Sequence, residues 1–164
     1  MYTDSHCHLS FPELVAQLPD IRQKMQDAHV TRALCICTTI EEFDQVHHLA
    51  KTYDNFWSTV GVHPDNEDIY EPTVQDLVEK GQLPRVIAIG ETGLDYYQMS
   101  ERKGGRTIDD MEWQRDRFRN HIRAARQIQL PMVIHTRASS DDTLRILKEE
   151  GEAGRASDQL KAQE

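Results

Sequence analysis

Short apolar runs rich in β-branched residues alternate with amphipathic stretches along this chain of 164 residues. Such alternation is typical of a parallel α/β sheet, because parallel strands need a long crossover that is usually helical. Five runs are predicted to be strands, at residues 2–7, 33–38, 56–62, 86–90 and 132–135. The pattern therefore predicts an α/β fold with five β/α units.

The stretches between these runs show the spacing of helices with one apolar face. The predicted apolar faces comprise Ile21, Met25 and Ala28; Phe43, Val46, Leu49, Ala50 and Tyr53; Val74, Leu77 and Val78; and Leu144 and Leu147. Thr73 and Ser139, each followed three residues later by Asp, are expected to be N-caps. The longest helix is predicted over residues 111–129, ending before Pro131.

Two polar segments interrupt this pattern. Residues 100–110 hold a Gly-Gly pair and are expected to form a flexible loop between the fourth strand and its helix. Residues 151–164 hold only one large apolar residue and are expected to be a frayed or disordered polar tail. The predicted organisation is thus a β/α region at 1–150 and a tail at 151–164.

Composition excludes some classes of function. The net charge of −9 argues against a protein that coats nucleic acid, since such binding depends on clustered Lys and Arg. No run is long and apolar enough for a membrane span, and no signal peptide is recognisable. Together with three cysteines lacking CxxC spacing, this leads us to expect a cytoplasmic protein with reduced thiols and no membrane partner.

Residues able to bind a metal fall mostly where the predicted strands end. His6 and His8 close the first strand, His63 follows the third, Glu91 follows the fourth and His135 closes the fifth. In a β/α barrel the carboxyl ends of the strands meet at one rim, where active sites lie. Alternation along a strand puts His6 and His8 on one face. We therefore expect a metal site formed by His6, His8, Glu91 and His135.

Other polar residues admit two interpretations. His63 either lines the pocket as a substrate or phosphate contact, or shapes the turn with Pro64. Asp95 and Tyr97 follow Glu91 closely and are candidates for orienting the ligands. The remaining histidines lie in helical stretches and are expected on helix surfaces: His29, His47, His48 and His121.

Four segments together resemble the TatD family of metal-dependent hydrolases. They are DSHCHL at 4–9, GVHP at 61–64, GETGLDYY at 90–97 and VIHTR at 133–137. GETGLDYY is long and specific, and the resemblance extends to about Gly151. It implies a TIM barrel of the metallo-dependent hydrolase type that binds two divalent ions and cleaves DNA, often as a 3′ to 5′ exonuclease.

The resemblance also implies roles for residues. His6 and His8 would bind the first ion, His135 the second, and Glu91 would bridge both and be the catalytic residue. Mg²⁺, Mn²⁺ and Zn²⁺ are the candidate ions, and they would activate water for attack on a phosphodiester. His63 and Arg137 are candidate substrate-binding residues, although Arg137 would equally suit a solvated or helix-capping position. The expected partner is DNA, single-stranded or at 3′ ends.

The chain departs from the family pattern after residue 150. Family members carry a further His in an HCF-type segment and an Asp in a TDSP-type segment, and neither segment is present. A TIM barrel needs ~250 residues and eight strands, whereas five strands are predicted here. We therefore expect a C-terminally truncated barrel, with about five of eight β/α units, one weakly bound ion and little or no catalysis.

Two alternatives to the deoxyribonuclease remain open at this point. The same ion pair can activate water against a carbonyl carbon, so an amidohydrolase or an esterase that deacylates transfer RNA is the second reading. The third is an inactive fragment, or one that works only after pairing with a separately made C-terminal half.

Overall fold

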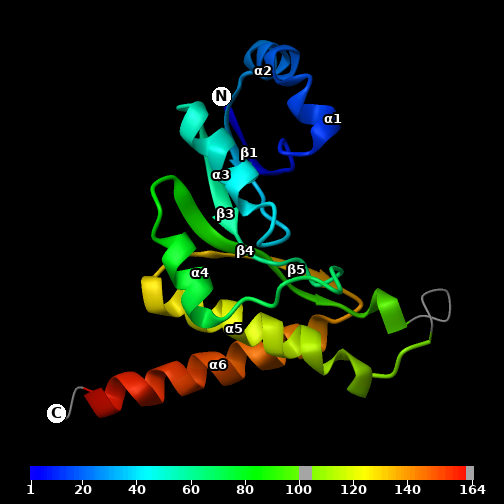
Figure 1. Cartoon of the computed structure of the whole chain (residues 1–164). Helices are drawn as coiled ribbons and strands as arrows, with labels where there is room; N and C mark the ends of the chain where they lie inside the picture. Colours follow the sequence, from blue (N-terminus) through cyan, green and yellow to red (C-terminus); the bar gives the residue numbers. More distant parts are fainter. Residues whose placement is uncertain (100–104, 162–164) are drawn as a thin grey trace.

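All five strands lie in one parallel sheet, in the order β1-β2-β3-β4-β5. The computed structural model describes residues 1–99 and 105–161. The strands are β1 (Tyr2–Cys7), β2 (Val30–Cys35), β3 (Phe56–Val60), β4 (Val86–Asp95) and β5 (Met132–Arg137). The sheet curls into a half-barrel with helices outside it (Figure 1). The predicted partial (β/α) barrel is thus confirmed.

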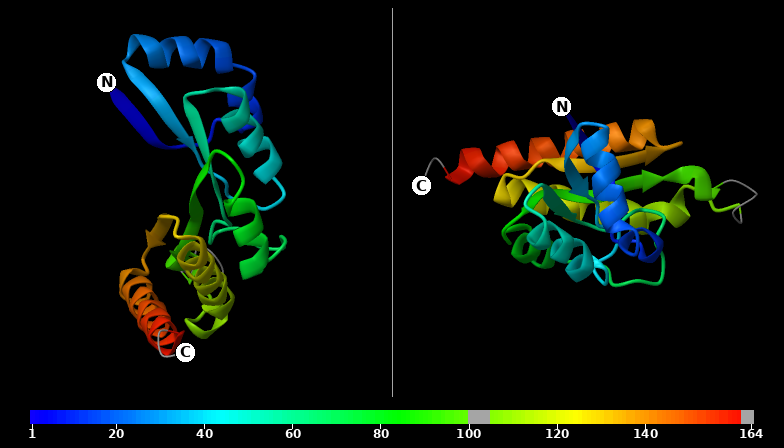
Figure 2. Two further views of the ribbon diagram at one scale, coloured as in Figure 1. Left: turned by 90° about the vertical axis from the view of Figure 1, so that its left-hand side faces the viewer. Right: turned by 90° about the horizontal axis from the view of Figure 1, so that it is seen from above.

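Six α-helices are assigned among the described residues, with two short 3₁₀ segments. They are α1 (Pro12–Val15), α2 (Leu18–Asp27), α3 (Phe43–Thr52), α4 (Val74–Gly81), α5 (Glu112–Ile128) and α6 (Ser140–Lys161), with η1 (Tyr96–Met99) and η3 (Asp109–Met111). They form an arc around the outside of the sheet, as Figure 2 shows. The only helix-to-strand order is therefore that of repeated β/α units.

Strand boundaries differ from the predicted ones in one way that matters for function. β4 continues through Asp95 instead of ending at Gly90, so Glu91 lies within the strand and not after it. The extra residues include Gly90 and Gly93, which have φ of 142° and 134° and lie so close to β5 that a Cβ would overlap its backbone. Glycine is unfavourable in ordinary strands, and the sequence pattern therefore underestimated this one.

Apolar side chains pack between the sheet and the helices in two clusters. The larger contains Phe43, Val46, Phe56, Val60, Leu77 and Ile89, and the smaller Leu94, Met111, Phe118, Ile122 and Ile146. The capping box predicted at Thr73 is present, with Asp76 as its partner. Ser139 instead donates its hydroxyl to the carbonyl of Leu94, 2.8 Å away. Polar and apolar contacts thus both fix helices to the sheet.

Two residues predicted to be core are exposed. Ala28 lies on the outer surface of the helical turn before β2, and Leu144 is 67% exposed. Helix α6 instead buries the face carrying Thr143, Ile146 and Glu150. Leu144 is two positions from Ile146, about 200° around the helix, and so points away from the core. The apolar pattern of α6 was too short to fix the rotation of the helix.

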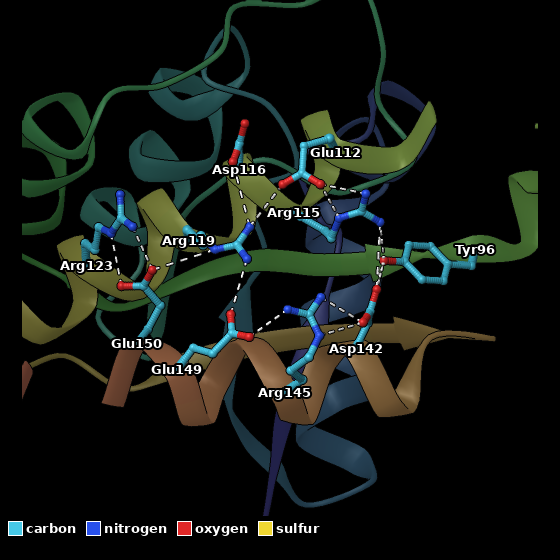
Figure 3. Close-up of polar contacts among 10 residues, drawn as sticks. All are labelled: Tyr96, Glu112, Arg115, Asp116, Arg119, Arg123, Asp142, Arg145, Glu149 and Glu150. Carbon is cyan, nitrogen blue, oxygen red and sulfur yellow. Dashed lines mark hydrogen bonds and ion pairs between the residues drawn. The ribbon is translucent and has the colours of Figure 1, made fainter. Parts of the chain in front are cut away.

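A ladder of ion pairs joins α6 to α5 (Figure 3). Arg119 reaches Glu112 and Glu149 at 3.4 and 3.3 Å, and Arg123 lies 2.7 Å from Glu150. Arg115, which is nearly buried, donates to the Tyr96 hydroxyl at 3.1 Å. The ladder fixes α6 beside α5 and ties both to the end of β4.

Residues 151–161 form part of α6, although we expected a tail without regular structure from Gly151. The segment is rich in Ala, Glu, Gln and Lys, which are good helix formers, and it continues a helix already nucleated upstream. Residues 162–164 of the expected tail and 100–104 of the expected loop lie outside the described residues. The rest of that loop contains η3.

The inner face of the half-barrel is partly open. Thr3, Ser5, Arg32, Leu34, Trp57 and Ile87 line a cleft of about 340 Å³ on this face. The edge strand β1 is exposed along most of its length. In the part of the chain that the structure describes, no helix has the length and apolarity needed to cross a bilayer.

Candidate metal centre

Glu91 lies at the centre of a cluster of imidazoles at the carboxyl-terminal end of the sheet. One carboxylate oxygen, Oε2, is 3.2 Å from Nε2 of His6. The other, Oε1, is 3.5 Å from Nδ1 of His135 and 3.9 Å from Nε2 of His63. The Glu91 side chain is 10% exposed. A carboxylate this buried must be paired or bound to a cation, and here only imidazoles approach it closely.

These residues form two overlapping groups that could each hold a metal ion. One group is His6, His8 and Glu91, and the other is His63, Glu91 and His135. Within each group the possible ligand atoms all lie within 4.8 Å of one another. Glu91 belongs to both groups, so it is the residue that could bridge two ions.

The first group has the chemistry expected of a metal site. Asp4 accepts the backbone N–H of His6 at 3.1 Å, and the ring of His8 stacks on Phe11 with centroids 5.1 Å apart. Nδ1 of His8 is buried with no hydrogen-bond partner in the described residues. An imidazole nitrogen without a partner is costly to bury. Two imidazoles and a carboxylate suit a divalent transition metal, so these residues fit the ion that the sequence implied.

His135 is oriented by a buried carboxylate. Its Nε2 lies 3.2 Å from Oδ2 of Asp95, which is fully buried. That contact places the ring proton on Nε2 and leaves Nδ1 free to bind a cation near Glu91. Burial alone would raise the pKa of Asp95, but hydrogen bonds from Arg137 and the Tyr97 amide outweigh it and hold that pKa below its usual value.

Arg137 reaches the cluster through Asp95. Its Nε donates to Oδ1 of Asp95 at 2.8 Å, and a second nitrogen pairs with Oδ2. Its guanidinium also lies over the ring of Tyr97, 4.6 Å from the centroid. Arg137 is therefore neither a freely solvated residue nor a helix cap. The side chain remains 46% exposed, so part of it still faces solvent at the site.

His63 presents a hydrogen-bond donor to the cluster. The backbone N–H of Asp65 donates to Nδ1 of His63 at 3.0 Å, so the ring proton resides on Nε2. This Nε2 is 3.2 Å from the unprotonated Nδ1 of His135. Burial lowers the pKa of His63, and the neighbouring His135 adds to this, although Glu91 acts in the opposite direction. The geometry suits donation to a bound oxygen better than it suits a metal ligand.

Two histidines that we expected on helix surfaces are buried. His47 is 2.8 Å from the carbonyl of Pro84 through Nε2 and stacks on Phe43. His121 is completely buried in α5, and burial lowers its pKa to about 4. The prediction for both was wrong, because a helical pattern does not reveal which polar residues face a loop packed over the helix. His29 and His48 are exposed, as expected.

Sequence reasoning also missed Gln114 and Arg117 of α5, both buried. Together with His121 they hold the backbone around His63, as detailed below. Their spacing along the helix, at i, i+3 and i+7, was the available signal, because polar residues on one face of an otherwise core-facing helix need buried partners.

Residues 3–157 match the family model described as TatD related DNase. The uncharacterized metal-dependent hydrolase YcfH of Escherichia coli is 36% identical over 151 residues, covering 90% of this chain and 53% of that protein. Human deoxyribonuclease TATDN3 is 32% identical over 158 residues, covering 90% of this chain and 56% of that protein. The chain spans about half the length of the curated relatives it matches.

Solved structures show the same fold. The crystal structure of YJJV, a TatD homologue from Escherichia coli, superposes with a TM-score of 0.76 at 24% sequence identity. The match covers 91% of this chain and 56% of that one. A TatD family hydrolase from Entamoeba histolytica gives a TM-score of 0.72 at 20% identity. At these identities the likeness concerns the fold alone.

Proposed function

Because the chain belongs to the TatD-related DNase family, we propose that its histidine and glutamate cluster serves the divalent-metal-dependent hydrolysis of phosphodiester bonds in DNA. The observation that carries the proposal is the double use of Glu91, which belongs to both potential metal-binding groups. Relatives named metal-dependent hydrolase and deoxyribonuclease support the reaction class.

The residues divide naturally between two ions. His6 and His8 with Glu91 would hold the first, and His135 with Glu91 the second. Three imidazoles and a carboxylate accept Zn²⁺, Mn²⁺ or Mg²⁺, with decreasing preference by ligand softness. The second set has fewer donors once His63 is counted as a hydrogen-bond donor. We therefore expect the first set to bind an ion more tightly than the second.

Bound divalent cations supply Lewis acidity that polarises a phosphoryl oxygen and makes water acidic enough to attack near neutral pH. The chain's own residues position the reactants. Asp95 keeps the proton of His135 on Nε2 and thereby directs Nδ1 toward the cluster. Nε2 of His63 can donate to a phosphate oxygen placed beside Glu91. The solvent-facing edge of Arg137 offers a further contact for the phosphate.

Single-stranded DNA or a 3′ end is the substrate that we propose. The net charge of −9 disfavours extensive contact with a duplex backbone, so recognition would concentrate at the metal-binding cluster itself. A strand end can reach such a cluster more readily than the middle of a duplex can.

The test combines metal binding with cleavage by the full chain. Calorimetric titration with Mn²⁺ should detect at least one bound ion, and Glu91→Ala should abolish binding at both groups because it removes the shared ligand. His48→Ala is the matched control, since His48 is exposed on α3 and outside the cluster. Wild-type chain that binds no Mn²⁺ or Zn²⁺ would refute the proposal.

Substrate class is tested in parallel. DNA labelled at the 5′ end and digested with Mn²⁺ should yield a ladder that shortens from the 3′ end, and Glu91→Ala should remove it. Aminoacylated transfer RNA is the second substrate in the same assay. Release of the amino acid without DNA cleavage would replace the deoxyribonuclease by an esterase that uses the same residues.

A further inference from the structure

Three buried polar side chains of α5 hold the segment that carries His63. We call Gln114, Arg117 and His121 the α5 anchor. They lie at i, i+3 and i+7 on one face of the helix, and each is no more than 6% exposed. None of them reaches Glu91 or the other candidate ligands through a printed contact, so they do not belong to the metal-binding groups.

Each member of the anchor takes one backbone group of three consecutive residues. His121 accepts the N–H of Val62 on Nε2 at 3.0 Å. Arg117 donates to the carbonyl of His63 at 2.8 Å. Gln114 donates to the carbonyl of Pro64 at 2.8 Å. The segment after β3 is thus held one residue at a time by successive turns of α5.

The anchor also fixes the orientation of each of its own members. Nδ1 of His121 donates to the carbonyl of Arg117 at 2.8 Å, which leaves Nε2 as the acceptor for Val62. Arg117 is held by Glu71, at 2.9 Å from Nε. Gln114 accepts the backbone N–H of Asp95 at 2.8 Å, so one side chain contacts the backbones of both the His63 segment and the end of β4.

We propose that the α5 anchor is a positioning device that keeps Nε2–H of His63 directed at the oxygen-binding space beside Glu91. The inference rests on the proposed function, because it assigns that donor to a phosphate. Buried backbone groups need hydrogen-bond partners in any protein. Here the partners set where Asp65 lies, and the N–H of Asp65 sets which nitrogen of His63 carries the proton.

The experiment observes His63 directly and needs no metal. Long-range ¹H–¹⁵N spectra of the labelled full chain report which imidazole nitrogen is protonated, and His63→Asn identifies the signal. Wild-type chain should show His63 protonated at Nε2 alone. In His121→Phe, which cannot accept the N–H of Val62, the signal should average between both tautomers. His121→Gln retains an acceptor and should restore the wild-type pattern.

A second readout links the anchor to the site. With saturating Mg²⁺, His121→Phe should bind inorganic phosphate about tenfold more weakly than wild type, as expected for one lost hydrogen bond to an anion, while its affinity for Mg²⁺ stays unchanged. His47→Phe is the matched control: it removes a buried histidine that also contacts a backbone carbonyl, but on α3. It should change neither the His63 signal nor phosphate binding.

The outcomes separate the anchor from the proposed function. His63 protonated at Nδ1 in wild type, or an unchanged His63 signal in folded His121→Phe, would overturn the anchor. If His121→Phe does not fold, the wild-type spectrum and His121→Gln still decide, because loss of the Nε2 tautomer in folded His121→Gln would equally contradict the proposal. Wild-type chain that shows the expected tautomer but binds no metal would refute the proposed function and leave the anchor standing.

Discussion

Asp95→Asn is the substitution that tests the arrangement of the second group most severely. The side chain is fully buried and accepts four hydrogen bonds. Oδ1 receives Nε of Arg137 and the N–H of Tyr97, and Oδ2 receives the other Arg137 nitrogen and Nε2 of His135. Asparagine keeps the shape but replaces one oxygen by an NH₂ group.

Whichever way the amide turns, its NH₂ group meets two donors, so two of the four hydrogen bonds are lost. Hydrogen bonds to buried charged groups contribute about 1.5–3 kcal/mol each, which gives about 3–6 kcal/mol for two. Water can reach the half-exposed Arg137 and compensate part of this loss. We therefore expect the free energy of unfolding to fall by about 2–4 kcal/mol.

Loss of the carboxylate should also weaken the second group. His135 would no longer be held in the tautomer that leaves Nδ1 free, and removal of such a supporting carboxylate typically weakens metal binding by about 10–100-fold. Urea unfolding at pH 7 and Mn²⁺ titration by calorimetry measure the two effects. Asp142→Asn is the control, because Asp142 also pairs with arginines but lies in the α5–α6 ladder.

Asp142→Asn should reduce stability without changing the affinity for Mn²⁺. If Asp95→Asn unfolds within about 1 kcal/mol of wild type and binds Mn²⁺ equally well, the hydrogen bonds described here do not orient His135, and the assignment of that residue as a ligand loses its support.

Three further outcomes are expected. Gly93→Ala should cost about 2 kcal/mol or more in urea unfolding and weaken Mn²⁺ binding, because φ is 134° and a Cβ would lie 2.0 Å from the carbonyl oxygen of His135. Stability should fall between about pH 6.5 and pH 4, since the pKa of His121 drops from 6.5 to about 4 on folding and the unfolded chain binds the extra proton. This loss, on the order of 3 kcal/mol, should be absent from His121→Phe when unfolding is compared at pH 7 and pH 4.5. Arg115→Met should lower the unfolding free energy by about 1–3 kcal/mol through lost contacts with Tyr96 and its neighbours, and leave the calorimetric Mn²⁺ affinity unchanged.

Much of the candidate site was accessible from sequence because its residues sit at a recurring place, the carboxyl ends of parallel strands. His6 and His8 share a strand face by alternation alone, and an apolar run leads into Glu91. The role of Asp95 was partly accessible, since it lies near Glu91 in the chain. Its contacts with His135 and Arg137 were not, because they join residues about 40 positions apart.

Residues of α5 show where local patterns stop being informative. The spacing of Gln114, Arg117 and His121 indicates that they share a helix face, but not that a loop some 50 residues earlier lies against that face. Leu144 illustrates the same limit for an apolar residue, because the rotation of α6 depends on what packs around it.

The sequence by itself determined the parallel β/α order and the residue types able to bind a cation, since both follow from periodicity and from side-chain chemistry within a few positions. Only the tertiary structure decided that Glu91 is shared by two groups, that Asp95 selects the free nitrogen of His135, and that α5 selects the donor nitrogen of His63. The physical reason is that a hydrogen bond depends on the placement of two groups to within a few tenths of an ångström. Such placement results from the curl of the sheet and the packing of helices on it.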